Sequence, residues 1–186
     1  MRRKVRVTIQ GAQFAGKTHL LRQLQGREYD FENDAQTKTD EEFKRFKVRT
    51  DNGVLVVKKG ADRGGSVANA DHEMVNDIRR ANVIIYLFRL KYYLSDDIQF
   101  KERVDTDFQT IFNELQPKKQ VLIVGCTYIM QDYSSKKESQ DAVDEAIKIW
   151  NEKEWRDMIK FSKLVLLDTQ KDKNAYLEII KAIFKK

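Results

Sequence analysis

The sequence predicts an α/β fold with three layers, in which a mostly parallel sheet lies between two layers of helices. Segments with strand periodicity alternate with segments with helical periodicity along nearly the whole chain. Two of the predicted strands, residues 82–88 and 120–124, are almost entirely apolar, as expected where helices cover both faces of a sheet. Asn52-Gly53 lies between two further strands and predicts a hairpin. We therefore expect six strands and five helices, with one antiparallel strand at the edge of the sheet.

The first predicted strand, residues 4–10, alternates charged and apolar residues and runs into a glycine-rich loop. A helix is expected over residues 16–25, because its leucines share one face and Gly26 follows as a terminator. These leucines are Leu20, Leu21 and Leu24. Residues 27–42 are polar and aperiodic, and a loop of this length in a compact domain is usually functional or mobile.

The middle of the chain begins with two strands, residues 43–50 and 54–59, on either side of the predicted hairpin. A helix follows, recognised by apolar residues that share one face, and the strand over residues 82–88 comes directly after it. The apolar residues of this helix are Met74, Val75, Ile78 and Ala81.

The second half of the chain opens with a long helix, which Ser95-Asp96-Asp97 caps and Pro117 follows. Its predicted buried stripe consists of Val104, Phe108, Ile111, Phe112 and Leu115. The strand over residues 120–124 comes next, and then a helix marked by Val143, Ala146, Ile147 and Trp150. The last strand is expected over residues 163–167, and the final helix is marked by Tyr176, Ile179, Ile180, Ile183 and Phe184.

The composition is that of one globular domain spanning residues 1–186, with 41% apolar residues and no repeat or linker. The net charge of +6 is spread over alternating positive and negative residues, so we expect a solvated surface and no nucleic-acid partner. No apolar run is long enough for a membrane span, and no apolar segment of signal-peptide length follows the basic start. The lone Cys126 fits a reducing compartment, and we expect the cytosol. The sequence is silent on oligomeric state.

The motif with the clearest chemistry is Gly11, four residues, then Gly16-Lys17-Thr18, placed between a strand and a helix. Backbone N–H groups of such a loop converge on phosphate oxygens, with the positive end of the helix dipole behind them. Lys17 would neutralise the terminal phosphates and the Thr18 hydroxyl would bind Mg²⁺. The predicted nucleotide-binding residues are Gly11, Gln13, Phe14, Ala15, Gly16, Lys17, Thr18, His19 and Thr127.

Two further pieces of the chain fit the same site. Asp62-Arg63-Gly64-Gly65 follows a strand, so that Asp62 would hold Mg²⁺ through water and the Gly65 N–H would meet a γ-phosphate. Lys17 and Gly65 are therefore the predicted catalytic groups. A threonine of the polar loop, Thr37 or Thr39, would complete the metal shell, and we prefer Thr39. The alternatives are an ordinary turn at residues 62–65 and ordinary loop threonines.

These pieces, in this order, resemble the small GTPases of the Ras and Arf type over nearly the whole chain. "AGKT" and "DRGG" are nearer the Arf branch. The resemblance implies a P-loop NTPase fold, binding of GTP or GDP with Mg²⁺, and slow hydrolysis. It also implies that residues 27–42 and 62–80 are the two switch regions, which change conformation and signal to an effector or regulatory protein.

The sequence departs from this family at the base and at the catalytic water. Ile129 stands where the Asn-Lys-x-Asp motif has its base-reading aspartate, and Asp132 lies three positions further on. Asp168-Thr169-Gln170 replaces the Ser-Ala-Lys-like signal after the last strand. No residue here supplies the expected bidentate acceptor for guanine.

Ser66 replaces the water-orienting glutamine, for which Gln13 or His72 would be the substitute. Gln13 and Phe14 also stand where Ras relatives have glycines, so their side chains would crowd the γ-phosphate.

Two alternative functions follow from these departures. One is a pseudo-GTPase, a binding module without turnover, which Ser66 and Ile129 favour. The other is a P-loop kinase or ATPase with no guanine preference. The kinase lacks its expected arginine-rich lid, since "SSKKES" contains no arginine, and the antiparallel hairpin suits it poorly.

Overall fold

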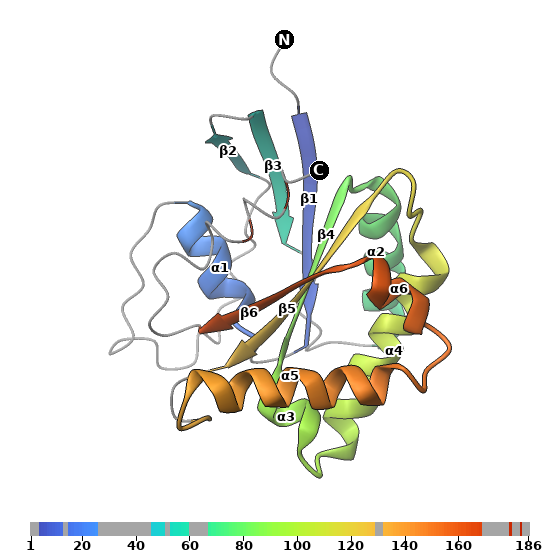
Figure 1. Cartoon of the computed structure of the whole chain (residues 1–186). Coiled ribbons are helices and arrows are strands. Elements are labelled where there is room, and N and C mark those ends of the chain that lie inside the picture. The colour runs from blue at the N-terminus through green and yellow to red at the C-terminus, as the bar shows by residue number, and fades with distance from the viewer. Residues whose placement is uncertain are drawn as a thin grey trace.

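The computed structural model describes residues 4–12, 15–25, 46–50, 53–59, 67–128 and 132–168, together with residues 179 and 183. Within these residues one sheet lies between helices on its two faces (Figure 1). The strands are β1 (Lys4–Gly11), β2 (Phe46–Thr50), β3 (Gly53–Lys59), β4 (Val83–Arg89), β5 (Val121–Tyr128) and β6 (Lys163–Asp168). The helices are α1 (Lys17–Leu24), α2 (Val67–Arg80), α3 (Leu90–Leu94), α4 (Ile98–Glu114), α5 (Lys136–Trp150) and α6 (Arg156–Phe161). The predicted three-layer α/β class is confirmed.

The sheet contains six strands in the order β2-β3-β1-β4-β5-β6. Only β2 and β3 are antiparallel, and Thr50 pairs with Gly53 at their turn, as the hairpin signal predicted. All the other pairs are parallel, with Gly11 opposite Leu87 between β1 and β4, and Arg89 opposite Thr127 between β4 and β5. Parallel strands end at the same edge, so the carboxyl ends of β1, β4, β5 and β6 lie together.

Each face of the sheet covers its own hydrophobic core. Val83, Ile85 and Leu87 of β4 pack with α1 and with Ile179 on one face. Ile84, Tyr86 and Phe88 of the same strand pack with α2, α4 and α5 on the other. A strand that is buried on both faces needs apolar residues at every position, which explains the run in β4.

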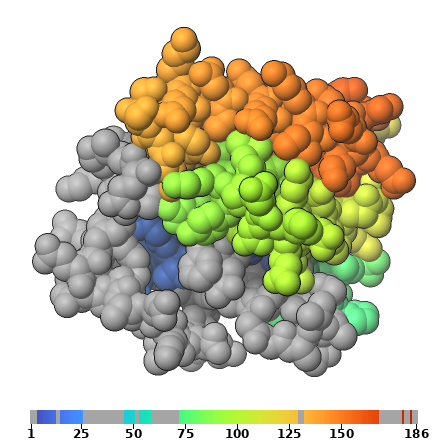
Figure 2. All heavy atoms as spheres, turned by 90° about the horizontal axis from the view of Figure 1, so that it is seen from below, coloured from blue at the N-terminus to red at the C-terminus, as the bar shows by residue number. Residues whose placement is uncertain are grey.

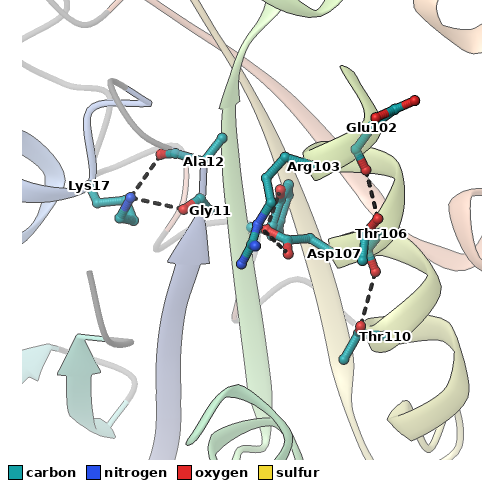
Figure 3. Close-up of polar contacts among 9 residues, drawn as sticks. Gly11, Ala12, Lys17, Glu102, Arg103, Thr106, Asp107 and Thr110 are labelled. Atoms are coloured by element: carbon teal, nitrogen blue, oxygen red, sulfur yellow. Dashed lines mark hydrogen bonds and ion pairs between the residues drawn. The ribbon is translucent and has the colours of Figure 1, made fainter. Parts of the chain in front are cut away.

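A charged residue lies inside the core that the sheet forms with α2, α4 and α5. Asp107 of α4 is buried, and it accepts a hydrogen bond from the hydroxyl of Tyr86 at 2.9 Å. The Nε of Arg103, one turn earlier on α4, lies 3.3 Å from the same carboxylate (Figure 3). A buried carboxylate is tolerated only with such partners, so these contacts tie α4 to the centre of the sheet.

The helices of the described residues differ from the prediction in two places. α3 and α6, of five and six residues, were not predicted, because segments this short carry no measurable periodicity. The described part of the chain therefore has six helices, the four that were predicted there and these two short ones. The predicted final helix lies outside the described residues, apart from Ile179 and Ile183.

The long helix α4 begins as expected, because the Asp97 side chain accepts a hydrogen bond from the Phe100 N–H at 3.0 Å. Its predicted buried stripe was wrong at Phe112, which is 39% exposed. Phe112 follows the fully buried Ile111, and one residue turns the helix by about 100°, away from the core. Among the described helices, none is both long and apolar enough to cross a bilayer.

Candidate functional site

The loop between β1 and α1 lies between two glycines whose backbone conformation few other residues adopt. Gly11 has a φ of 146° and Gly16 a φ of 81°. A Cβ on Gly11 would lie 2.0 Å from the Leu87 carbonyl oxygen, so β4 approaches the loop too closely for any side chain at this position. The Ala12 N–H donates to this same oxygen at 3.1 Å. The start of the loop is therefore held against the end of β4.

Lys17 is folded back over the loop from the first residue of α1. Its Nζ donates to the carbonyl oxygens of Gly11 at 2.9 Å and Ala12 at 2.8 Å (Figure 3). The side chain is only 8% exposed, which is unusual for a lysine. A buried ammonium beside the amino end of a helix concentrates positive charge at the mouth of the loop. This arrangement is suited to an anion with several oxygens, such as a chain of phosphates.

The residues that follow the lysine begin α1. Thr18 is half-buried, and Ala15, just before Gly16, is buried. Burial lowers the pKa of His19, and the nearby charge of Arg22 lowers it further. The His19 Nε2 lies 2.7 Å from the amide nitrogen of Gln23, and because an amide nitrogen only donates, this Nε2 accepts. Both effects favour the neutral form of His19, which lies next to the predicted metal ligand Thr18.

Several predicted site residues lie outside the described part of the chain. They are Gln13, Phe14, Thr37, Thr39, Asp62, Gly65, Ser66 and Ile129. Their predicted roles, like the switch region over residues 27–42, stay predictions. The second switch region is described from Val67 onward, where it forms α2, and His72 is exposed on this helix.

The carboxyl-terminal half of α2 is fixed to the sheet by polar contacts. The Nζ of Lys58 on β3 lies 2.7 Å from a carboxylate oxygen of Asp77, which is 7% exposed. The Gln120 amide nitrogen donates to the Ile78 carbonyl at 2.6 Å and to the Ala81 carbonyl at 2.8 Å. The end of the predicted second switch region is thus held by one contact from β3 and by two from the residue that precedes β5.

The end of β5, where the family reads its base, presents no free carboxylate among the described residues. The Thr127 hydroxyl donates to the Phe88 carbonyl at 3.0 Å, and the residue is 2% exposed, so its side chain is engaged inside the sheet. The Tyr128 ring lies against that of Tyr133, with ring centres 6.0 Å apart. Cys126 is buried, which raises the pKa of its thiol to about 12.

Asp132, the first acidic residue along the chain after β5, is bound by an arginine from the neighbouring strand. The Nε and Nη2 of Arg89 donate to its two oxygens at 3.1 and 3.0 Å. Lys91 Nζ lies 3.7 Å from one of them, and the Asp132 side chain is 3% exposed. Arg89 was not predicted as a site residue, although it is the one charged residue of the otherwise apolar strand β4.

The β1–α1 segment and the helices that follow β4 lie on one face of the molecule. Figure 2 views the lower edge of Figure 1, and there the blue atoms of the β1–α1 segment lie next to the green atoms of α3 and α4. The orange atoms of α5 border the green ones on the other side. The described residues thus bring Lys17, Arg89 and the end of β5 to one edge of the sheet.

The chain matches no family model and no curated protein. Its fold matches a variant of Era from Aquifex aeolicus bound to GDP and AlF4⁻, with a TM-score of 0.63, 18% identity, and coverage of 98% of this chain and 56% of Era. Elongation factor SelB from Methanococcus maripaludis, in complex with the GTP analogue GppNHp, matches with a TM-score of 0.61, 14% identity, and coverage of 98% and 34%.

A dimerization-deficient mutant of Toc33 from Arabidopsis thaliana matches with a TM-score of 0.60, 13% identity, and coverage of 97% and 82%. The chain thus spans about half of Era and a third of SelB, but most of Toc33. At these identities the matches establish the fold. The protein shares the three-layer α/β fold of these proteins, the P-loop NTPase fold.

Proposed function

We propose that this protein binds GTP and GDP with Mg²⁺ at the loop between β1 and α1, and that it works as a nucleotide-dependent switch with slow hydrolysis. The observation that carries the proposal is the buried Lys17 ammonium, held by two carbonyl oxygens of the loop at 2.8 and 2.9 Å. Guanine is proposed because the fold is shared with proteins whose structures hold GDP or a GTP analogue.

Each described residue of the loop has a distinct task in this proposal. Gly11 and Gly16 allow the backbone to turn so that its N–H groups face the phosphates. Lys17 supplies the positive charge that a terminal phosphate needs once water is excluded. The Thr18 hydroxyl, one residue further on, is the proposed protein ligand for Mg²⁺, together with Thr39 and Asp62. The metal would neutralise charge on the β- and γ-phosphates when bound.

Signalling is proposed to run through the two switch regions, residues 27–42 and 62–80, to an effector or regulatory protein. The Lys58–Asp77 pair and the Gln120 contacts support this, because they give α2 a fixed carboxyl-terminal half around which its beginning can respond to the phosphates. A partner that binds the GTP-analogue form at least tenfold more tightly than the GDP form is the expected outcome, measured by calorimetry.

A pseudo-GTPase is the second candidate, favoured by the Arg89–Asp132 pair. Asp132 lies three positions after the place of the family's base reader, and its two oxygens already accept from Arg89. With Ser66 in place of the glutamine, the site has neither the aspartate that reads the base in the small GTPases nor their water-orienting glutamine. An ATPase is distinguished from both by its affinity for ATP.

The decisive experiment identifies the nucleotide that co-purifies with the protein by mass spectrometry, followed by calorimetry with Mg²⁺ and GDP, GTP or ATP. Lys17→Ala is expected to weaken GDP binding about 100-fold or more, because it removes a desolvated charge–phosphate contact. Lys4→Ala is the matched control, since Lys4 is exposed at the beginning of β1, at the end of that strand away from the loop. If no purine nucleotide binds at millimolar concentration, the proposal is wrong. Phosphate release that Lys17→Ala abolishes would exclude the pseudo-GTPase.

A further inference from the structure

The side chain of Arg89 is held rigidly at the edge of the sheet where a nucleotide would lie. Its Nε and Nη2 bind the two oxygens of Asp132 in a bidentate pair, and its guanidinium carbon lies 4.9 Å from the centre of the Tyr92 ring. The side chain is 17% exposed, and Asp132 is 3% exposed. A guanidinium fixed by a paired carboxylate and an aromatic face is oriented in advance for a ligand.

The register of the sheet places Arg89 between the phosphate loop and the end of β5. Gly11 pairs with Leu87, two residues before Arg89, and Arg89 itself pairs with Thr127. With strands about 4.8 Å apart and about 3.3 Å per residue, the Cα atoms of Gly11 and Arg89 are roughly 8 Å apart. Side chains alternate along a strand, so Arg89 leaves β4 on the face of Leu87, which α1 covers. Its side chain reaches toward Asp132, beyond β5, and therefore toward the expected base end.

The pair with Asp132 leaves hydrogen-bond donors available. A guanidinium has five N–H groups, and the two contacts to Asp132 use one on Nε and one on Nη2. Among the described residues, Nη1 has no hydrogen-bond partner, so its N–H groups can donate to a ligand. Two neighbouring acceptors on a planar ring are the natural partners of such donors, and the O6 and N7 atoms of guanine form such a pair.

We propose that Arg89 recognises the nucleobase by donating to O6 and N7 of a 6-oxopurine. This rests on the proposed nucleotide-binding function and names the residue that selects the base. The polarity is opposite to that of an aspartate reader, which accepts from N1–H and the 2-amino group. Adenine is disfavoured because its 6-amino group would point its hydrogens at the guanidinium. Asp132 is a positioning residue here, because it acts on the base through Arg89.

The two modes of base reading differ in the atoms of guanine that matter. Inosine lacks the 2-amino group and keeps O6 and N7, so IDP should bind within about threefold of GDP if Arg89 reads the base. Replacing N7 by carbon, as in 7-deaza-GDP, should weaken binding about tenfold, because a donor of Arg89 is left unpaired. ADP should bind about 10- to 100-fold more weakly than GDP. If a carboxylate reads the base instead, IDP should bind more weakly than GDP, and 7-deaza-GDP should bind as tightly as GDP.

The experiment measures the affinities of the wild-type protein for GDP, IDP, 7-deaza-GDP and ADP by calorimetry with Mg²⁺. It is repeated on Arg89→Met, which should bind GDP about 10- to 100-fold more weakly and lose the preference over ADP. Lys91→Met is the matched control, because Lys91 also faces Asp132, at 3.7 Å, but is 52% exposed and should leave the preference unchanged. Arg89→Met/Asp132→Leu removes both charges and provides a folded variant if the single change leaves Asp132 buried and unpaired.

The outcomes separate this inference from the proposed function. If GDP binds and 7-deaza-GDP binds equally well, or if IDP binds at least tenfold more weakly than GDP, Arg89 does not read the base while the nucleotide site stands. Equal affinities for GDP and ADP in the wild-type protein also overturn the inference alone. If none of the four nucleotides binds, both proposals fall. The wild-type series decides the question even if no Arg89 variant folds.

Discussion

At the scale of single residues, β4 constrains two glycines in different ways. A Cβ on Gly11 would meet the Leu87 backbone at 2.0 Å, and the φ of Gly11 is 146°. A Cβ on Gly125 would meet the end of the Leu87 side chain at 2.3 Å and that of Leu167 at 3.3 Å. The backbone of β4 cannot move without breaking its hydrogen bonds to the neighbouring strands, whereas a leucine side chain can change rotamer.

We therefore expect Gly11→Ala to lower the free energy of unfolding by about 3 kcal/mol and to abolish nucleotide binding. Gly125→Ala should cost about 1–2 kcal/mol, because it only overfills a core that can rearrange. Urea denaturation of the two variants measures the difference, and calorimetry measures binding. Equal losses of stability would show that the close approach of β4 does not determine the start of the loop.

At the scale of elements, the end of α2 depends on a glutamine that lies just before β5. The last carbonyl groups of a helix have no partner within the helix. The side-chain amide nitrogen of Gln120 donates to the carbonyl groups of Ile78 and Ala81. Its side-chain oxygen Oε1 accepts from the Gln116 N–H at 2.8 Å. The residue is 8% exposed, so water does not readily replace these contacts.

Gln120→Met keeps the volume of the side chain and removes its hydrogen bonds, and should destabilise the protein by about 2 kcal/mol. Amide hydrogen exchange should become faster in the last turn of α2 than in α5, because only α2 loses its anchor. Gln140→Met is the control, since Gln140 is exposed on α5 and should change stability very little. Unchanged exchange in α2 would contradict this account of how the second switch region is fixed.

At the scale of the whole molecule, burial couples stability to alkaline pH. Desolvation raises the pKa of Cys126 from 9.0 to about 12, and desolvation together with the negative charges of Asp132 and Glu138 raises that of Tyr133 from 10.0 to about 12. The folded state then holds protons that the unfolded state releases. The contribution of these two groups to the free energy of unfolding is fully present below about pH 9 and is lost as the pH rises toward 12.

The free energy of unfolding, measured by urea denaturation, should therefore fall steadily between pH 9 and pH 11. Cys126→Ala should make this decline shallower, because the thiol then no longer contributes. The native thiol should also react slowly with a disulfide reagent at pH 8 and rapidly after unfolding, since it is buried and protonated. A pH profile that is identical in the wild-type protein and Cys126→Ala would refute the contribution of the thiol.

The sequence predicted much of the fold because each element carries a local signal. The apolar run of β4, the Asn52-Gly53 turn and the Asp97 cap are signals of this kind, and the structure confirms the elements that they predict. The short helices α3 and α6 were missed because five or six residues are too few for a periodicity. Phe112 was assigned to the core because the sequence pattern does not show how wide the buried face of the helix is. An apolar residue beside that face can therefore be either buried or exposed.

The sequence by itself determined the phosphate end of the candidate site. The spacing of Gly11, Gly16 and Lys17 is a local property, since these residues are joined by a short stretch of backbone. Only the tertiary structure brought together Arg89 and Asp132, the proposed base end. Arg89 and Asp132 are 43 residues apart, and they meet because parallel strands β4 and β5 end at the same edge of the sheet. A contact made across neighbouring strands depends on register and strand order, and neither is written in a local pattern.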